Sequence, residues 1–186
     1  FCGYNSFEVD ITDFIRFDAD NVLAVYVDTT SHHEGWWYEG GGIYRPVWMI
    51  KTDLVSVDRY GVYIHPEKTD EEAWRVPAEI TVRNDDSMEH SVLVRTNLVG
   101  PDNRIVAQMS EELHLGPKSK GTVFTETKAA DVLLWDTEAP RLYHAVTEII
   151  ENEAVKDEVT TTFGFRTLRF DSKEGFFLND RHVTLK

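Results

Sequence analysis

Aromatic residues followed directly by glycines form the stretch of this sequence best suited to chemistry. The aromatic residues at 36–38 precede Glu39 and the glycines at 40–42, and a strand-like run then begins at Ile43. Aromatic side chains offer flat faces, and consecutive glycines let the backbone turn tightly beside them. This combination suits a sugar ring or a contact with another domain. The loop over 35–45 is therefore the first candidate for a functional site.

Neighbouring carboxylates and neighbouring histidines are the other groups that could do chemistry. Side chains next to each other in a strand point to opposite faces, so adjacent carboxylates rarely converge on one bond. We expect a solvated role for them and no catalytic pair. We also expect no metal site at His32 and His33, because the sequence has no further ligands at a suitable spacing to complete the coordination. The adjacent carboxylates are Glu71 and Glu72, Asp85 and Asp86, and Glu111 and Glu112.

Charge and composition exclude several classes of partner. The chain has 186 residues, with 33 acidic against 19 basic side chains and a net charge of -14. Nucleic-acid binding needs clustered basic residues, so no nucleic-acid partner is expected. No apolar run approaches the roughly 20 residues of a membrane span, so no membrane partner is expected either. A neutral carbohydrate fits the charge, although an acidic surface also simply favours solubility.

Alternation of apolar and polar residues predicts a mainly β protein with two sets of strands. The later set, over residues 54–163, has about seven or eight short strands, the number typical of an immunoglobulin-like sandwich. We expect Trp135 in its core, Trp74 at an interface, and the Tyr143 hydroxyl tying down the backbone at a corner. The expected strands are Val57–His65, Ala78–Asn84, Ser91–Val99, Ile105–Met109, Glu111–Leu115, Gly121–Thr127, Leu142–Glu151 and Val155–Phe163.

The segments before and after this sandwich have their own patterns. Strands are expected at Asn21–Asp28 and Ile43–Asp53, as the last strands of a sandwich whose earlier strands are missing. After Gly164 a short hairpin turning at Asn179 and Asp180 has no obvious place in the sandwich. Because the chain begins without Met and ends inside a predicted strand, we expect it to be a piece of a longer protein.

Five motifs follow one another along the chain. They are Gly3-Tyr4…Phe7…Asp10-Ile11-Thr12, Asn21-Val22-Leu23-Ala24-Val25-Tyr26-Val27, Trp37-Tyr38-Glu39-Gly40-Gly41-Gly42-Ile43-Tyr44-Arg45, Trp135…Glu138…Pro140…Leu142-Tyr143, and Phe163-Gly164-Phe165-Arg166 with Phe177-Leu178-Asn179-Asp180-Arg181. In this order they resemble the motifs of glycoside hydrolase family 2, the β-galactosidase and β-glucuronidase group. The last motif departs from the family, which usually has glycine where Asp180 stands; Asp tolerates the turn at some cost.

The resemblance implies an all-β architecture in three parts. Residues 1–53 would be the C-terminal strands of a jelly-roll sugar-binding domain, 54–163 an immunoglobulin-like β-sandwich, and 164–186 a linker and the first hairpin of a TIM barrel. In the family, the two carboxylates of a retaining glycosidase, which lie about 5–5.5 Å apart, belong to the barrel. No catalytic residue is therefore expected in this chain, and the chain alone should not hydrolyse glycosides.

The resemblance also implies how the aromatic loop would work. Glu34, Trp37 and Glu39 are expected at the rim of the sugar pocket, although packing of the aromatics against protein is an alternative that stays open. Arg45 is expected to anchor the loop. The implied partners are a carbohydrate and the barrel in cis, with self-association through exposed sheet edges also open. No cofactor is expected in this chain, and a divalent cation in the barrel stays open.

A binding or adhesion module with no enzyme attached is the rival interpretation. It explains the aromatic loop but not the hairpin sequence after Gly164. The reading frame beyond Lys186 separates the two: a further barrel with paired glutamates favours the enzyme.

Overall fold

The computed structural model describes residues 6–28, 30, 41–69 and 73–184. Regular structure in these residues is almost entirely β, as predicted. The chain divides into two compact units, Phe1–Met49 and Ile50–Lys186. The elements are η1 (Thr12–Phe14), β1 (Val55–Ile64), β2 (Glu67–Lys68), β3 (Trp74–Asn84), β4 (His90–Val99), β5 (Ile105–Leu115), β6 (Ser119–Ala129), β7 (Tyr143–Glu151), β8 (Ala154–Phe163), β9 (Leu168–Asp171), β10 (Gly175–Leu178) and β11 (Arg181–Val183).

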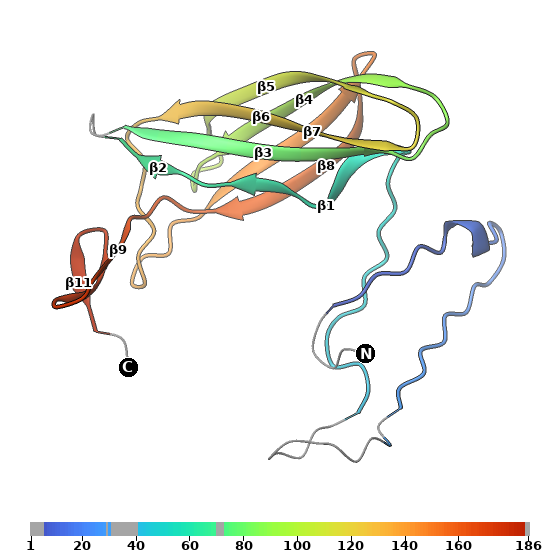
Figure 1. Cartoon of the computed structure of the whole chain (residues 1–186), viewed down its shortest axis with the longest axis horizontal. Helices are drawn as coiled ribbons and strands as arrows, with labels where there is room; N and C mark the ends of the chain where they lie inside the picture. The colour runs from blue at the N-terminus through green and yellow to red at the C-terminus, as the bar shows by residue number, and fades with distance from the viewer. Residues whose placement is uncertain (1–5, 29, 31–40, 70–72, 185–186) are drawn as a thin grey trace. The chain divides into compact units, whose positions relative to one another are not determined.

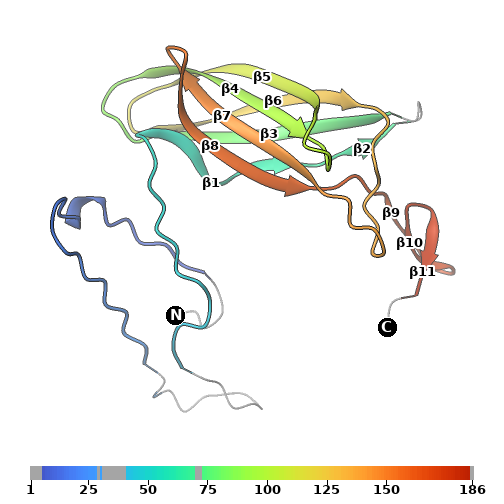
Figure 2. The ribbon, with the colours of Figure 1, turned by 180° about the vertical axis from the view of Figure 1, so that it is seen from behind.

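Two antiparallel sheets lie face to face in the second unit (Figures 1 and 2). In one sheet β3 is central, paired with β6 on one side and with β1 and β2 on the other. The other sheet has the order β5-β4-β7-β8. The chain passes from one sheet to the other between β3 and β4, between β5 and β6, and between β6 and β7. This arrangement is that of an immunoglobulin-like sandwich and agrees with the predicted fold class.

Strict alternation along the central strands builds the core between the sheets. In β3, Trp74, Val76, Ala78, Ile80 and Val82 all point inward and are buried. The strands β4 and β7 alternate in the same way. Such a period of two places every second side chain on one face, so each strand buries one row of apolar groups.

The predicted strands of the sandwich are confirmed with small changes of boundary. The two weak strands predicted over 105–115 are one continuous strand, β5, and β3 begins earlier than predicted, at Trp74. The prediction for Trp74 is wrong, because its side chain is 3% exposed and meets Phe165 edge-on at 5.3 Å between ring centroids. The next residue, Arg75, points to the opposite face of the strand, where it binds Glu67 and Glu126.

The first unit has no strand in its described residues. The strands predicted at Asn21–Asp28 and Ile43–Asp53 are therefore wrong as local structure in this chain. Among the described residues these two segments have no neighbouring strand to pair with. A strand without a partner leaves its backbone N–H and C=O groups without hydrogen bonds. Local polar contacts shape the segment instead: the Asn21 side-chain amide accepts from the Arg16 N–H at 2.9 Å and donates to the Arg16 carbonyl at 2.8 Å.

A three-stranded meander, β9-β10-β11, follows the sandwich within the second unit. Asn179 and Asp180 form the two-residue turn between β10 and β11, with φ angles of 50° and 62°. Positive φ at both positions is the conformation of a hairpin turn whose twist matches the strands. The turn predicted at these two residues is confirmed, and Asp180 occupies the position where the family usually has glycine.

Candidate functional site

The residues predicted to reach a sugar lie outside the described part of the chain. These residues are Glu34, Trp37 and Glu39. His32 and His33, for which no metal site is expected, also lie outside the described residues. Their roles therefore stay predictions. At the edge of the loop, Gly42 has φ 115°, a conformation that favours glycine. The Arg45 guanidinium lies over the Tyr44 ring, 5.6 Å from its centroid.

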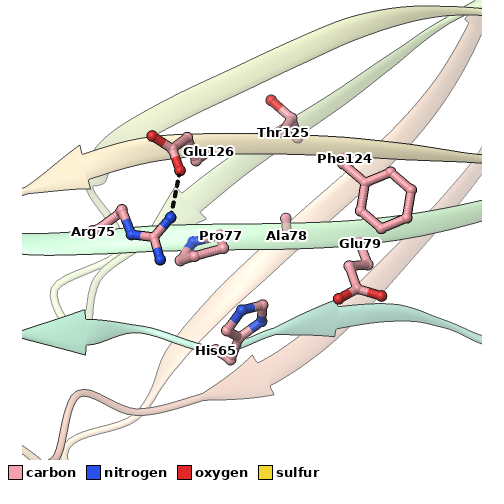
Figure 3. A pocket seen from close by; sticks show the side chains of 8 residues that line it. All are labelled: His65, Arg75, Pro77, Ala78, Glu79, Phe124, Thr125 and Glu126. Atoms are coloured by element: carbon pink, nitrogen blue, oxygen red, sulfur yellow. Dashed lines mark hydrogen bonds and ion pairs between the residues drawn. The ribbon is translucent and has the colours of Figure 1, made fainter.

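A shallow groove of about 570 Å³ crosses the outer face of the β1-β3-β6 sheet (Figure 3). It runs along β3, with Pro77 and the backbone at Ala78 as its floor. Phe124 and Glu126 come from β6 on one side, and His65 follows the end of β1 on the other. The remaining lining residues are Arg75, Glu79 and Thr125.

Two polar residues of the groove, Arg75 and Glu126, form an ion pair with each other. Arg75 bridges Glu67 and Glu126, and these bonds, first that to Glu67, raise the pKa of the guanidinium. His65 stacks on Tyr63 at 4.7 Å between centroids. Its Nδ1 is buried and has no hydrogen-bond partner among the described residues. The groove offers aromatic and carboxylate surface for contact, and lacks the facing pair of free carboxylates that hydrolysis of a glycoside needs.

This groove could not be predicted from the sequence. Its residues come from three strands that are neighbours only in the sheet: Glu79 pairs with Tyr63 of β1 and with Phe124 of β6. The sequence does indicate which residues of each strand face outward, because aromatic and charged residues alternate there with buried ones.

The adjacent carboxylates do not form catalytic pairs in the described part of the chain. Asp85 binds Arg83 at 3.0 Å, whereas Asp86 binds His90 at 3.1 Å, so the two acids serve different partners. Glu111 and Glu112 are both exposed on β5. Glu71 and Glu72 lie outside the described residues.

A charged cluster closes one end of the sandwich. His90, at the start of β4, contacts Glu151 through Nδ1 at 2.8 Å and Asp86 through Nε2 at 3.1 Å. The bond to Glu151, and then that to Asp86, raises the pKa of His90, while the bond from His90 lowers the pKa of Asp86. Lys156 lies 3.7 Å from both Glu151 and Asp53. We refer to these five residues as the His90 cluster.

The His90 cluster has the chemistry of a structural clamp. With both ring nitrogens facing carboxylates, the imidazole donates two hydrogen bonds when protonated.

Among the described residues, no group of three or more His, Cys, Asp or Glu side chains could hold a metal ion. Nor does any helix in the described part of the chain have the length and apolar character needed to cross a membrane.

The corner before β7 holds the residues of the Trp135 to Tyr143 motif. Tyr143 is 2% exposed, and its hydroxyl accepts a hydrogen bond from the Leu133 N–H at 2.8 Å. The predicted tyrosine corner is thus confirmed. The prediction that Trp135 lies in the core is wrong: it is half-buried, with the Arg166 guanidinium 4.9 Å from its ring centroid. The backbone of Trp135 pairs with Phe165 instead, its N–H donating at 2.8 Å.

The sandwich and its corner coincide with a known family. The family model described as Glycosyl hydrolases family 2 matches residues 55–166, which is more than half of the chain. The chain belongs to glycosyl hydrolases family 2. The resemblance drawn from the five sequence motifs is confirmed.

Curated family 2 relatives match nearly the whole chain, whereas the chain spans only about a fifth of their length. The β-galactosidase BoGH2A of Bacteroides ovatus is 36% identical over 98% of this chain and 22% of its own length. A β-glucuronidase of Formosa agariphila is 26% identical over 98% of this chain and 21% of its own length. These family 2 proteins are named as glycosidases of two different sugars.

A solved family 2 structure supports the same alignment. β-Glucuronidase 2 of Bacteroides uniformis, covalently bound to cyclophellitol-6-carboxylate aziridine, superposes with a TM-score of 0.81. The match has 25% identity and covers 95% of this chain and 22% of that one. The all-β architecture of this chain is therefore that of a corresponding part of family 2 glycosidases.

Proposed function

We propose that this chain is the scaffold portion of a longer family 2 enzyme that hydrolyses β-glycosides in carbohydrate metabolism, a retaining β-galactosidase in the first instance. One observation carries the proposal: a β-galactosidase matches 98% of this chain, but the chain spans 22% of that enzyme. The described adjacent carboxylates serve structural partners or solvent. The catalytic acid/base and nucleophile would therefore belong to the TIM barrel in cis.

We assign the chain three roles within that enzyme. Residues 1–53 contribute to a jelly-roll domain, 54–163 form the spacer sandwich, and 164–186 lead into the barrel. The meander after β8 supports the last role, since its strands form a sheet of their own in the part of the chain that the structure describes. The test is a kinetic assay of the longer protein with aryl β-galactoside and aryl β-glucuronide. Turnover of at least one is expected; a folded longer protein that cleaves neither would contradict the proposal.

We propose that Glu34, Trp37 and Glu39 complete the rim of the sugar pocket. An aromatic face can carry a sugar ring, and a carboxylate can accept bonds from its hydroxyl groups. In the longer enzyme, Trp37→Ala should raise KM with an unchanged melting temperature. Trp48→Ala, which removes an indole outside the loop, is the matched control and should leave KM unchanged. A lowered melting temperature with unchanged KM in Trp37→Ala would assign the loop to packing.

Self-association of the isolated chain is also proposed. The first unit exposes large apolar side chains, among them Val22 at 92% and Tyr26 at 88%. Apolar surface of this kind favours contact with a second copy. Sedimentation should show dimers or larger species as concentration rises, and a clean monomer at high concentration would count against it.

A further inference from the structure

The side chain of Asn179 bridges two segments that are far apart in the sequence. Its Oδ1 accepts a hydrogen bond from the Thr167 N–H at 3.0 Å, and its Nδ2 donates to the Trp135 carbonyl at 2.9 Å. Its backbone N–H donates to the Thr167 carbonyl at 3.0 Å. One residue of the β10–β11 turn is thus hydrogen-bonded both to the segment before β9 and to the corner before β7.

Further contacts surround this bridge. Arg181 donates to Asp136 Oδ1 at 2.7 Å, and this bond lowers the pKa of the Asp136 carboxyl. Leu178, next to Asn179, is almost fully buried. The corner before β7 therefore contacts the meander through two consecutive residues, Trp135 and Asp136.

The meander cannot hold its own position by size alone. Its strands have four, four and three residues. Such short strands bury little apolar surface, and small sheets depend on packing against a larger body. The meander also lies beyond residue 166, where the family match ends. The bonds of Asn179 to Trp135 and of Arg181 to Asp136 join it to the larger sandwich.

We propose that Asn179 is a positioning residue that locks the β9-β11 meander to the Trp135 corner, so that meander and sandwich move as one body. Arg181 and Asp136 reinforce the lock at the protein surface, where an ion pair contributes little by itself. The inference concerns the second unit alone and does not depend on the proposed glycosidase activity.

The two turn residues provide a matched pair of variants. Asn179 and Asp180 both have positive φ, so glycine fits either position without strain. Asn179→Gly removes the bridging amide and keeps the turn. Asp180→Gly changes the backbone in the same way but leaves the bridge intact. Any difference between them therefore reports the Asn179 side chain.

The experiment is NMR on the whole 186-residue chain, with residual dipolar couplings and amide exchange. In the original chain and in Asp180→Gly, couplings from meander and sandwich should fit one alignment tensor. In Asn179→Gly they should need two, and the Thr167 amide, which donates to Asn179 Oδ1, should exchange at least about ten-fold faster. Cross-strand contacts between Phe170 and Phe176 should persist, because the meander itself stays folded.

A second variant separates the two hydrogen bonds of the amide. Asn179→Asp keeps an acceptor for Thr167 but places a carboxylate oxygen against the Trp135 carbonyl, so it should also release the meander. Asp180→Asn is its control and should behave like the original chain. The proposal is overturned if both Asn179 variants keep one alignment tensor, or if the meander strands unfold, which would make Asn179 a hairpin residue only.

Discussion

His90 connects three parts of the sandwich through one imidazole ring. Asp86 belongs to the turn after β3, Glu151 ends β7, and Lys156 of β8 joins the same cluster. The contacts made by the ring are charge-assisted and mostly shielded from solvent. Such hydrogen bonds stabilise a fold more than neutral ones.

The His90 cluster predicts a pH dependence of stability. The pKa of His90 is raised from 6.5, so its contribution is fully present below pH 6.5 and is lost as pH rises through the higher folded value. The pKa of Asp86 is lowered from 3.8, so its contribution is present above pH 3.8 and is lost as pH falls through the lower folded value. In urea unfolding at a series of pH values, the free energy of unfolding should fall as pH rises above 6.5 and through the raised pKa of His90.

Two histidine variants test the origin of that loss. His90→Gln should flatten the decline above pH 6.5, because it removes the imidazole whose pKa the cluster raises. His114→Gln removes an exposed histidine of β5 and should leave the decline unchanged. An identical pH profile for His90→Gln and the original chain would show that the cluster does not control stability.

Single residues differ in how far their sequence context reveals their role. Tyr143 and the turn at Asn179 and Asp180 sit in local patterns, so their positions could be predicted. The His90 cluster could not, because Glu151 is 61 positions from His90 and only sheet pairing brings them together. The burial of Trp74 could not be predicted for the same reason: its ring packs against Phe165, which follows β8 and is far from Trp74 in the sequence.

Among the elements, β1 is distinguished by a bulge that depends on one glycine. Its register against β3 shifts between Val57 and Val62. Within the bulge, a Cβ added at Gly61 would lie 2.6 Å from the Thr81 carbonyl oxygen and 2.7 Å from that of Asp58. Both are backbone atoms, so neither can move aside cheaply. A close approach of this kind is a common reason for glycine in a strand.

Gly61→Ala should therefore destabilise the chain by about 1–3 kcal/mol, because the bulge must open to admit the methyl group. Gly116→Ala is the control, since its Cβ would meet only the Ser119 hydroxyl at 3.7 Å. That variant should stay within about 0.5 kcal/mol of the original. Denaturant midpoints measure both, and equal midpoints for the two variants would argue against a tight bulge.

The alternation of apolar residues predicted elements well only where a partner strand is present. The strands predicted at Ser91–Val99 and Leu142–Glu151 are β4 and β7, and in both of them burial alternates along the strand. The runs at 21–28 and 43–53 have equally strong β propensity, yet they form no strand among the described residues. Propensity reports what a side chain prefers, whereas a strand also needs hydrogen bonds from a neighbour.

At the scale of the whole molecule, the chain combines a complete sandwich with two flanking segments. Curated relatives match it almost end to end, and the chain covers only 22% and 21% of the length of two of them. The described side chains form the His90 cluster, the tyrosine corner at Tyr143 and the Asn179 bridge. Each of these joins one part of the sandwich or meander to another. We therefore expect this chain to orient the parts of a glycosidase without carrying out the reaction.

Assay of the purified 186-residue chain with aryl β-galactoside and aryl β-glucuronide tests this expectation most directly. A sample of the longer enzyme, assayed in parallel, provides the reference. The chain should release no aryl product above the rate in buffer, because a retaining glycosidase needs two carboxyl groups about 5–5.5 Å apart and we place both in the barrel. Turnover that stays with the chain through repurification would contradict the assignment and place a catalytic pair within these residues.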